Sequence, residues 1–341
     1  MIARNISEIM MSLSNSLIAR KNMKVSIVIP VYFNEDNLLP LYADLKSKFI
    51  DQIDYEYEIV MVNDGSKDDS YKVMQSLAEK DSNIKIISLS RNFGSHAAIL
   101  CGLSNSTGDC AVIKAADLQE PTELILQMVD KWKAGFNVVL ACRESRNESK
   151  TQIGFANMYY WMVRKTALPA MPKNGFDIFL LDRKVIRVID SLDEKNSAIT
   201  GQILWSGFKT GTVFYTRKAR DIGTSKWTLK KKIRLVSDTL FSFSTLPVRF
   251  LEIIGVMSFV VGLVWALIVC FSKLTNDVPV SGYASLFIFN LLSFGISMIS
   301  LGILGEYIWR IFDAARDRPP YIIEESNLDN NSTSALQKVR I

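Results

Sequence analysis

Three oxygen-bearing side chains, Asp117, Gln119 and Glu120, follow a mostly apolar run over residues 110–116 and precede Pro121. The apolar run predicts a buried strand, and the residues after it predict the start of a helix. Open α/β sheets bind ligands at the carboxyl ends of their strands. A carboxylate in that place can hold a divalent metal ion through hard oxygen ligands, and the metal ion can hold a nucleotide diphosphate. The alternative interpretation is an ordinary strand end at which Asp117 precedes a helix.

Polar side chains also follow three other predicted strands, which are short and rich in Val and Ile and cover residues 25–31, 58–62 and 84–89. The residues after these strands include Asn34 and Glu35, Asn63 and Asp64, and Arg91 and Asn92. Any one of these groups could instead form an ordinary turn without a role in binding, as the Asp64-Gly65 pair illustrates. Because the carboxyl ends of parallel strands meet at one edge of a sheet, four polar strand ends favour one shared site.

The elements that must position this site alternate between strand and helix. A fifth strand is predicted over residues 138–143, and helical patterns lie between the strands, over residues 37–49, 70–79, 96–106 and 122–133. This alternation predicts an α/β fold, with a mostly parallel sheet and helices on both of its faces. The chain has neither a Gly-x-Gly-x-x-Gly motif after the first strand nor a Walker-type loop. These absences argue against a dinucleotide oxidoreductase and a P-loop enzyme.

The sequence after the fifth strand is harder to interpret. Residues 144–180 are less regular, a helix is predicted over residues 184–192, and a pair of extended segments is predicted over residues 208–217. Residues 229–248 place basic and apolar side chains at helical spacing. This pattern predicts an amphipathic helix at a membrane interface, with an ordinary surface helix as the alternative.

Two long stretches near the C-terminus, residues 253–271 and 283–305, carry no charged side chain. Each is close to the roughly 20 residues that a helix needs to cross a bilayer. Basic residues flank the pair, and the segment between them is short, so the positive-inside rule places both termini and the α/β domain in the cytoplasm. The alternative is a pair of buried core helices. Glycines within both stretches allow close helix contacts and predict a homo-oligomer.

Five parts follow from this pattern. They are an N-terminal extension (1–22), the α/β domain (23–228), the interface helix (229–248), a two-helix transmembrane domain (249–310, with spans at about 251–272 and 283–307) and a cytoplasmic tail (311–341). The end of the tail, after Tyr321, is polar and is predicted to be disordered.

Composition excludes several classes of function. The chain of 341 residues has a net charge of +5, one histidine and four cysteines that lie within apolar runs. One histidine excludes a multi-histidine metal site, and the cysteine spacing predicts buried thiols in a reducing compartment rather than a disulfide framework or a zinc site. Basic residues gather beside the apolar stretches, which favours anionic lipid headgroups or a phosphate-bearing substrate over nucleic acid.

Seven motifs occur in order within residues 24–323. They are Val-Ile-Pro-Val-Tyr-Phe-Asn-Glu (28–35), Val-Asn-Asp-Gly-Ser (62–66), Leu-Ser-Arg-Asn-Phe-Gly (89–94), Ala-Asp-Leu-Gln-Glu-Pro (116–121), Leu-Asp-Arg-Lys (181–184), Phe-Ser-Phe-Ser (241–244) and Gly-Ile-Leu-Gly-Glu-Tyr (302–307). Together with the two apolar stretches, they resemble the membrane-anchored family 2 glycosyltransferases with a GT-A fold, a Rossmann-like, mostly parallel sheet. These enzymes are the bactoprenol glucosyltransferases and their dolichyl-phosphate mannose synthase relatives.

The resemblance implies inverting transfer of a sugar, commonly glucose, from a nucleotide sugar, expected to be UDP-linked, to a polyprenyl phosphate such as undecaprenyl phosphate. This reaction would serve cell-envelope or O-antigen glycan modification, and the protein would be a multi-pass protein of the bacterial plasma (inner) membrane. The resemblance assigns Mg²⁺ or Mn²⁺ binding to Asp117 and Gln119, since a divalent cation stabilises the developing charge of a diphosphate leaving group. It assigns nucleotide binding to Pro30, Tyr32, Glu35, Asp64, Arg91 and Asp117.

The acceptor phosphate is already anionic near neutral pH, so it needs cationic positioning more than a general base. Arg143 and Arg146, just after the fifth predicted strand, can supply a guanidinium fork. Three further candidates, Arg217, Arg220 and Lys226, lie before the predicted interface helix. Each of these cations is alternatively a solvated surface charge. The residues expected to take part in catalysis are Asp117, Asp177 and Arg143.

The chain departs from the family pattern at two positions. Ala115 stands in place of the first Asp of the commoner Asp-x-Asp motif, and Phe179 stands in place of the Arg of an Asp-Phe-Arg motif. Mg²⁺ usually keeps several waters, so Asp117 and Gln119 can suffice with the diphosphate, and Glu120 is a further candidate ligand. The alternative is a catalytically weak or silent homologue that acts as a membrane scaffold in envelope-glycan assembly. A processive polysaccharide synthase is disfavoured, because the chain lacks a Gln-x-x-Arg-Trp motif and has two predicted spans.

Overall fold

A computed structural model describes most of the chain. It covers residues 23–144, 150–192, 194, 198–217, 236, 238–239, 241–244, 246–275 and 282–328. The predicted N-terminal extension, Arg146, Arg220, Lys226, most of the predicted interface helix and the end of the predicted tail lie outside the described residues.

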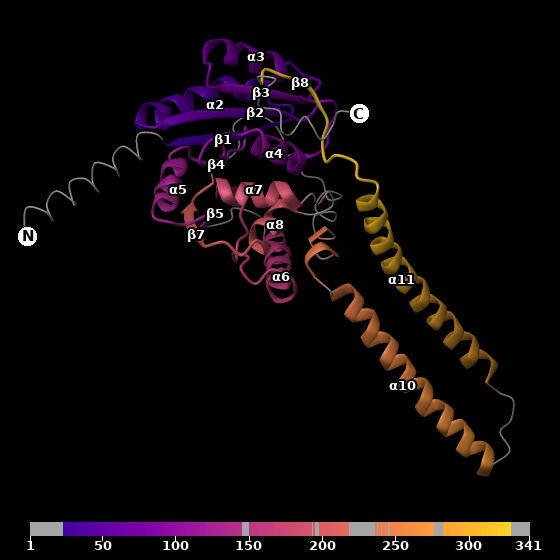
Figure 1. The fold of residues 1–341 in the computed structure, drawn as a ribbon. Coiled ribbons are helices and arrows are strands. Elements are labelled where there is room, and N and C mark those ends of the chain that lie inside the picture. The colour runs from indigo at the N-terminus through magenta and orange to yellow at the C-terminus, as the bar shows by residue number, and fades with distance from the viewer. Residues whose placement is uncertain are drawn as a thin grey trace, which may run out of the picture.

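The α/β domain is built on one eight-stranded sheet with the order β7-β5-β6-β4-β1-β2-β3-β8 (Figure 1). The strands are β1 (Lys24–Val31), β2 (Glu56–Asn63), β3 (Ile84–Leu89), β4 (Cys110–Ile113), β5 (Val138–Arg143), β6 (Ile178–Asp182), β7 (Thr210–Tyr215) and β8 (Ile323–Ser326). β6 runs antiparallel to both of its neighbours, and β8 runs antiparallel to β3, while the other pairs are parallel. Six strands therefore point the same way, which confirms the predicted mostly parallel sheet.

Helices cover both faces of the sheet (Figure 1). They are α2 (Glu35–Lys48), α3 (Ser70–Lys80), α4 (Ser95–Ser104), α5 (Leu124–Lys133), α6 (Lys150–Thr166), α7 (Arg183–Leu192) and α8 (Ile199–Trp205). Alternate side chains of a strand point to opposite faces. Accordingly, Ile27 and Ile29 of β1 pack in one core with α2, α3 and α5, while Val28 packs in a second core with α4, α7 and α8. Three of the four cysteines, Cys101, Cys110 and Cys142, are buried free thiols, as predicted.

Two strands in the second half of the chain correct the sequence-based expectations. Residues 144–180 were expected to be irregular, but β6 begins at Ile178 and inserts between β4 and β5. Its apolar run of four residues is too short to distinguish a strand from a loop by periodicity alone. The pair of extended segments expected over residues 208–217 is a single strand, β7.

The segment after Tyr321 is ordered through β8, so the prediction of disorder is wrong for Ile323–Ser326. The side chain of Asn327 fixes this strand to the backbone of β3. Its Oδ1 accepts a hydrogen bond from the N–H of Ile86 at 2.7 Å, and its Nδ2 donates to the carbonyl of Ile84 at 3.1 Å. Because backbone pairing with an edge strand needs no apolar side chains, a polar sequence can form this strand.

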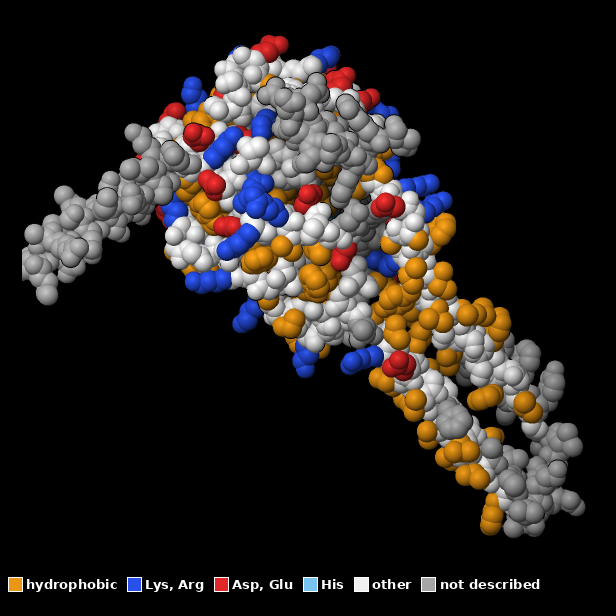
Figure 2. Space-filling view, in the orientation of Figure 1, with side chains coloured by type: hydrophobic (Ala, Val, Ile, Leu, Met, Phe, Trp, Pro, Cys, Tyr) orange, Lys and Arg blue, Asp and Glu red, His pale blue; other side chains and the backbone are white. Residues whose placement is uncertain are grey.

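Two long helices, α10 (Leu246–Thr275) and α11 (Tyr283–Ala315), extend away from the α/β domain (Figure 1). Each contains a stretch long and apolar enough to cross a membrane, Pro247–Trp265 and Ser293–Ala315, and neither stretch is buried. Their hydrophobic side chains line the outside of both helices (Figure 2). The alternative of two buried core helices is therefore wrong.

Candidate active site

The sheet topology explains why the candidate residues converge. β1 to β5 and β7 all point the same way, so the residues that follow them meet at one edge. Because β6 runs in the opposite direction, the residue that precedes it, Asp177, lies at that same edge. One region at this edge of the sheet is thus lined by four segments: the residues after β4, the ends of β5 and β7, and the start of β6.

The segment after β4 turns sharply and then enters α5. Leu118 adopts a left-handed conformation, with φ of 58°, and Asp117 Oδ1 accepts a hydrogen bond from the backbone N–H of Gln119 at 3.3 Å. Lys114 holds the turn in place, because its buried Nζ donates a hydrogen bond to the backbone carbonyl of Glu120. The turn thereby holds Asp117, Gln119 and Glu120 together, as the sequence pattern predicts.

Arg217, two residues after β7, reaches into this turn. Its Nη2 donates a hydrogen bond to Gln119 Oε1 at 2.5 Å and lies 3.8 Å from Asp117 Oδ2 and 3.7 Å from Glu120 Oε1. The Glu120 side chain is 2% exposed. Burial and the nearby Asp117 raise the pKa of Glu120, although Lys114 and Arg217 act against this rise.

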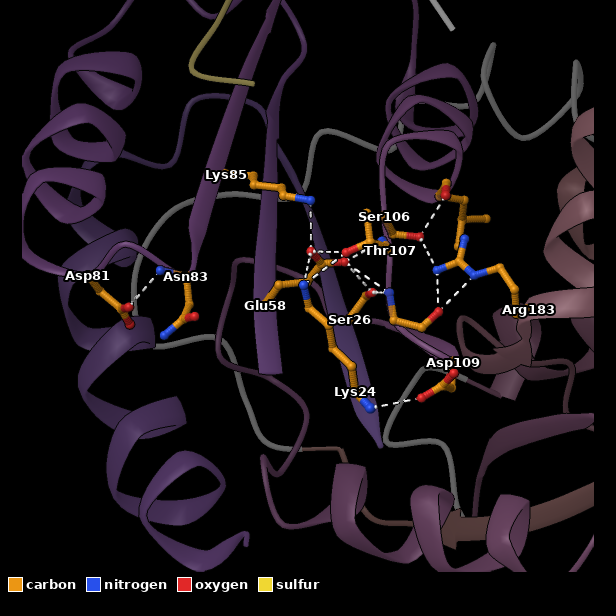
Figure 3. A network of polar contacts seen from close by, with 12 residues as sticks. Lys24, Ser26, Glu58, Asp81, Asn83, Lys85, Ser106, Thr107, Asp109 and Arg183 are labelled. Atoms are coloured by element: carbon orange, nitrogen blue, oxygen red, sulfur yellow. Dashed lines mark hydrogen bonds and ion pairs between the residues drawn. The ribbon is translucent and has the colours of Figure 1, made fainter. Parts of the chain in front are cut away.

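A second carboxylate on the sheet shows how a buried Glu is normally satisfied. Glu58 lies near the start of β2, at the opposite edge of the sheet, and its side chain is also 2% exposed (Figure 3). It accepts hydrogen bonds from Ser26 Oγ at 2.6 Å and Thr107 Oγ1 at 2.8 Å, and Lys85 Nζ lies 2.8 Å from its Oε2. In contrast, Glu120 Oε2 has no hydrogen-bond partner among the described residues. The carboxylate at the candidate site is therefore less satisfied than the one in the structural network.

Arg143 and Asp177 form an ion pair at the same edge, between the end of β5 and the start of β6. Asp177 remains 57% exposed and Arg143 is 16% exposed. Burial lowers the pKa of Arg143, but Asp177 and Tyr215 together raise it by more, so the guanidinium stays protonated. Asn174 fixes the strand end by donating a hydrogen bond to the carbonyl of Arg143 at 2.8 Å. The pair thus offers a fixed cation beside an accessible carboxylate.

The predicted nucleotide-binding residues lie in the loops after β1, β2 and β3. Asp64 is 3% exposed and accepts hydrogen bonds from the backbone N–H groups of Phe93 at 2.7 Å and Gly94 at 3.0 Å. Gly65 has φ of +65°, and a Cβ there would lie 2.4 Å from the carbonyl carbon of Arg91. These contacts tie the loop after β2 closely to the loop after β3.

The other predicted nucleotide-binding residues differ in exposure and contacts. Glu35 accepts a hydrogen bond from the backbone N–H of Asp69, just before α3, at 2.7 Å, so its carboxylate is engaged with the fold. Tyr32 is half-buried, and the exposed Arg91 stacks over the ring of Phe93 at 4.0 Å. Pro30 is half-buried near the end of β1. Within this set, Arg91 is exposed and Tyr32 is half-buried, whereas Asp64 is buried.

The chain is similar in sequence to known glycosyltransferases. Residues 26–189 match the model described as Glycosyl transferase family 2. A protein of Bacillus subtilis (strain 168), named "Uncharacterized glycosyltransferase YkcC", is 39% identical over 307 residues, which cover 90% of this chain and 95% of that protein. The "SfII prophage-derived bactoprenol glucosyl transferase" of Shigella flexneri is 35% identical over 309 residues, which cover 90% of this chain and 100% of that protein. The chain belongs to glycosyltransferase family 2.

The resemblance inferred from the sequence motifs is thereby confirmed, and the protein is a glycosyltransferase with a GT-A fold. Among solved structures, glucosyl-3-phosphoglycerate synthase from Mycobacterium tuberculosis, with Mn²⁺, uridine diphosphate and glucosyl-3-phosphoglycerate, has a TM-score of 0.45 with it. The two chains are 13% identical, over 65% of this chain and 82% of that one.

The residues of this glycosyltransferase fit a divalent metal ion by their chemistry. The turn after β4 supplies carboxylate and amide oxygens, which Mg²⁺ and Mn²⁺ prefer. The unpartnered Oε2 of Glu120 is a buried oxygen that a cation would satisfy. Among the described residues, no group of three or more His, Cys, Asp or Glu could hold a metal ion. A bound ion would therefore rely on the few side-chain oxygens of this turn together with water and the substrate diphosphate.

The sequence names two residues of this region, Arg217 and Phe179, without their contacts. Arg217 was one of several candidate cations after residue 208, and its contacts with the turn depend on the pairing of β7 with β5. Phe179, which replaces an arginine of the family pattern, lies in β6 and packs against Phe176 in the core. An arginine at position 179 would bury a charge in this structure.

Proposed function

We propose that the protein transfers a glucosyl group from a nucleotide sugar to a polyprenyl phosphate, with inversion at the anomeric carbon. The observation that carries the proposal is the oxygen-rich turn after β4 in a chain that also has two exposed apolar helices. The bactoprenol glucosyl transferases similar to this chain along 90% of its length support the choice of sugar and acceptor. A UDP-linked donor is the natural first candidate.

We assign the donor to the edge formed by the ends of β1 to β4. Tyr32 and Arg91 contact the nucleoside, Asp64 holds the loop that carries Arg91, and Pro30 and Glu35 shape the loop after β1. Asp117 and Gln119 hold Mg²⁺ or Mn²⁺ beside the diphosphate. When bound, the ion neutralises the negative charge that develops on the leaving diphosphate.

The acceptor attacks from the side of Arg143. A phosphate oxygen of the lipid forms a bond to the anomeric carbon while the bond between that carbon and the diphosphate oxygen breaks, and the nucleoside diphosphate leaves with the bonding electrons. Since the phosphate is already ionised, Arg143 aligns it and no base must remove a proton. Asp177 orients Arg143 and lies near the donor sugar. Arg146, Arg220 and Lys226 remain proposed contacts to the acceptor phosphate.

The membrane holds the acceptor at this site. We propose that α10 and α11 both cross the bacterial plasma membrane, with the α/β domain and both termini in the cytoplasm. The uncharged, exposed stretches and the basic residues that flank them support this topology. Self-association through the glycines of the two helices stays a prediction.

A donor screen tests the proposed function. The purified full-length protein would be incubated with undecaprenyl phosphate, Mg²⁺ or Mn²⁺ and a panel of nucleotide sugars, and the lipid products analysed by mass spectrometry. We expect one hexose to be added, most efficiently from UDP-glucose. Absence of transfer from every donor would favour a silent homologue with a scaffold role, which the Ala115 and Phe179 departures make a specific alternative. A product with many sugars would favour a processive synthase.

A further inference from the structure

Arg217 marks a cation position inside the turn after β4. One nitrogen, Nη2, lies near one side-chain oxygen of each of Asp117, Gln119 and Glu120, at 3.8, 2.5 and 3.7 Å. Two of these oxygens belong to carboxylates and the third to an amide. This is the donor set that a hard divalent cation takes in proteins. The same three side chains therefore enclose a guanidinium nitrogen here and match the chemistry of a metal ion.

The fit between Arg217 and Glu120 is incomplete. Their closest atoms are 3.7 Å apart, which is beyond hydrogen-bond distance. Glu120 Oε2 and Arg217 Nε are both buried without a hydrogen-bond partner among the described residues. A buried polar atom without a partner costs free energy. Glu58, which is equally buried, shows that this fold can satisfy a carboxylate fully. Glu120 thus keeps a buried oxygen, Oε2, that Arg217 does not satisfy.

We propose that Arg217 is an internal placeholder for the divalent ion and that Glu120 is a third protein ligand of that ion. In the donor-free enzyme the guanidinium neutralises part of the charge of Asp117 and Glu120. When the donor and the ion bind together, Arg217 leaves the turn and pairs with the donor diphosphate. Glu120 would then provide the second carboxylate that is missing at Ala115. This inference rests on the proposed function in one respect, that a divalent ion accompanies the donor.

The positive charge of Arg217 predicts that binding of the metal ion depends on binding of the nucleotide. A dication that enters the turn alone must displace a cation and leave its guanidinium without a counter-ion. With the diphosphate present, the displaced guanidinium gains an anionic partner. The affinity for the metal ion should therefore be low without nucleotide and should rise when nucleotide binds, which is a positive coupling between the two ligands.

Mn²⁺ binding to the purified full-length protein tests this inference directly. The free Mn²⁺ signal in electron paramagnetic resonance gives the dissociation constant with and without uridine diphosphate. In Arg217→Gln, we expect Mn²⁺ alone to bind about tenfold more tightly than in the unmodified protein, and its coupling to uridine diphosphate to fall by a similar factor. Arg217→Lys keeps the positive charge and should keep weak binding of Mn²⁺ alone. Glu120→Gln should weaken Mn²⁺ binding in both conditions.

The control is Lys209→Gln, which removes an exposed positive charge just before β7 and should leave Mn²⁺ binding unchanged. Thermal unfolding of each variant confirms that it is folded. If Arg217→Gln leaves the affinity for Mn²⁺ alone unchanged or weaker while the protein stays folded, Arg217 is a structural brace and the placeholder role is wrong. Unchanged Mn²⁺ binding in Glu120→Gln would remove Glu120 from the ligands. Failure of the unmodified protein to bind Mn²⁺ even with uridine diphosphate would instead overturn the metal-dependent function itself.

Discussion

The buried carboxylate of Asp64 accepts a hydrogen bond from the backbone N–H of Gly94 at 3.0 Å, immediately before α4. This contact joins the loop after β2 to the loop after β3, which carries Arg91. We therefore propose that Asp64 acts on the nucleotide site by shaping this loop, which would explain why an acidic residue follows β2.

Asp64→Asn should loosen the loop that carries Arg91. An amide nitrogen cannot accept a hydrogen bond, so the N–H of Gly94 would lose its 3.0 Å bond and keep only the 3.3 Å contact to the other oxygen, at a cost of about 1 kcal/mol. We expect the KM for the nucleotide sugar to rise and hydrogen exchange to become faster over residues 90–95. Asp36→Asn, at an exposed position in the first turn of α2, is the matched control and should change neither quantity. An unchanged exchange rate in Asp64→Asn would contradict the positioning role.

Glu58 should make the stability of the α/β domain depend on pH. Burial alone would raise its pKa, but hydrogen bonds from Lys85, Ser26 and Thr107 lower it from 4.5 to about 2. A carboxyl whose pKa is depressed in the folded state stabilises that state at every pH above the pKa of the unfolded chain. This contribution is lost as the pH falls from about 4.5 towards 2. Glu58→Gln should lower the free energy of unfolding near pH 7 by about 2–3 kcal/mol and flatten its decline over that interval. Thermal unfolding at a series of pH values measures both effects, and an undiminished slope in the variant would be the contrary result.

Arg143→Lys should impair use of the lipid acceptor more than use of the donor. Lysine keeps the positive charge but loses the guanidinium fork that can hold a phosphate with two hydrogen bonds. We expect the KM for polyprenyl phosphate to rise about tenfold with little change in the KM for the nucleotide sugar. Arg187→Lys, at an exposed position on α7, provides the control. A selective rise in the donor KM would assign Arg143 to the donor instead.

Asn327→Ala should weaken the pairing of β8 with β3. The substitution removes the hydrogen bonds that the side chain makes with the backbone of Ile84 and Ile86. We expect a loss of about 1 kcal/mol of local stability and faster hydrogen exchange in β3 and β8. Glu324→Ala, at an exposed position in the same strand, should leave exchange unchanged. Equal exchange in the two variants would show that backbone pairing alone holds β8.

The sequence predicts the first half of the fold well because its signals are local. Each of β1 to β5 is an apolar run followed by polar residues, and the grouping of Asp117, Gln119 and Glu120 in the turn after β4 follows from that pattern. The place of Asp177 was not derivable from such runs, because it depends on the reversed direction of β6 between two distant strands. The approach of Arg217 depends in the same way on the pairing of β7 with β5. β8 escaped prediction because its order comes from backbone hydrogen bonds to β3 rather than from apolar side chains.

Transfer of glucose from UDP-glucose to undecaprenyl phosphate by the purified full-length protein tests the proposed function most directly. We predict formation of a lipid carrying one glucose that stops when the divalent ion is chelated, resumes when Mg²⁺ or Mn²⁺ is restored, and falls by at least about a hundredfold in Asp117→Asn. Asp109→Asn, at the opposite edge of the sheet, should retain activity. Undiminished transfer in a folded Asp117→Asn protein, or metal-independent transfer, would contradict the assignment of the turn after β4 as the catalytic centre.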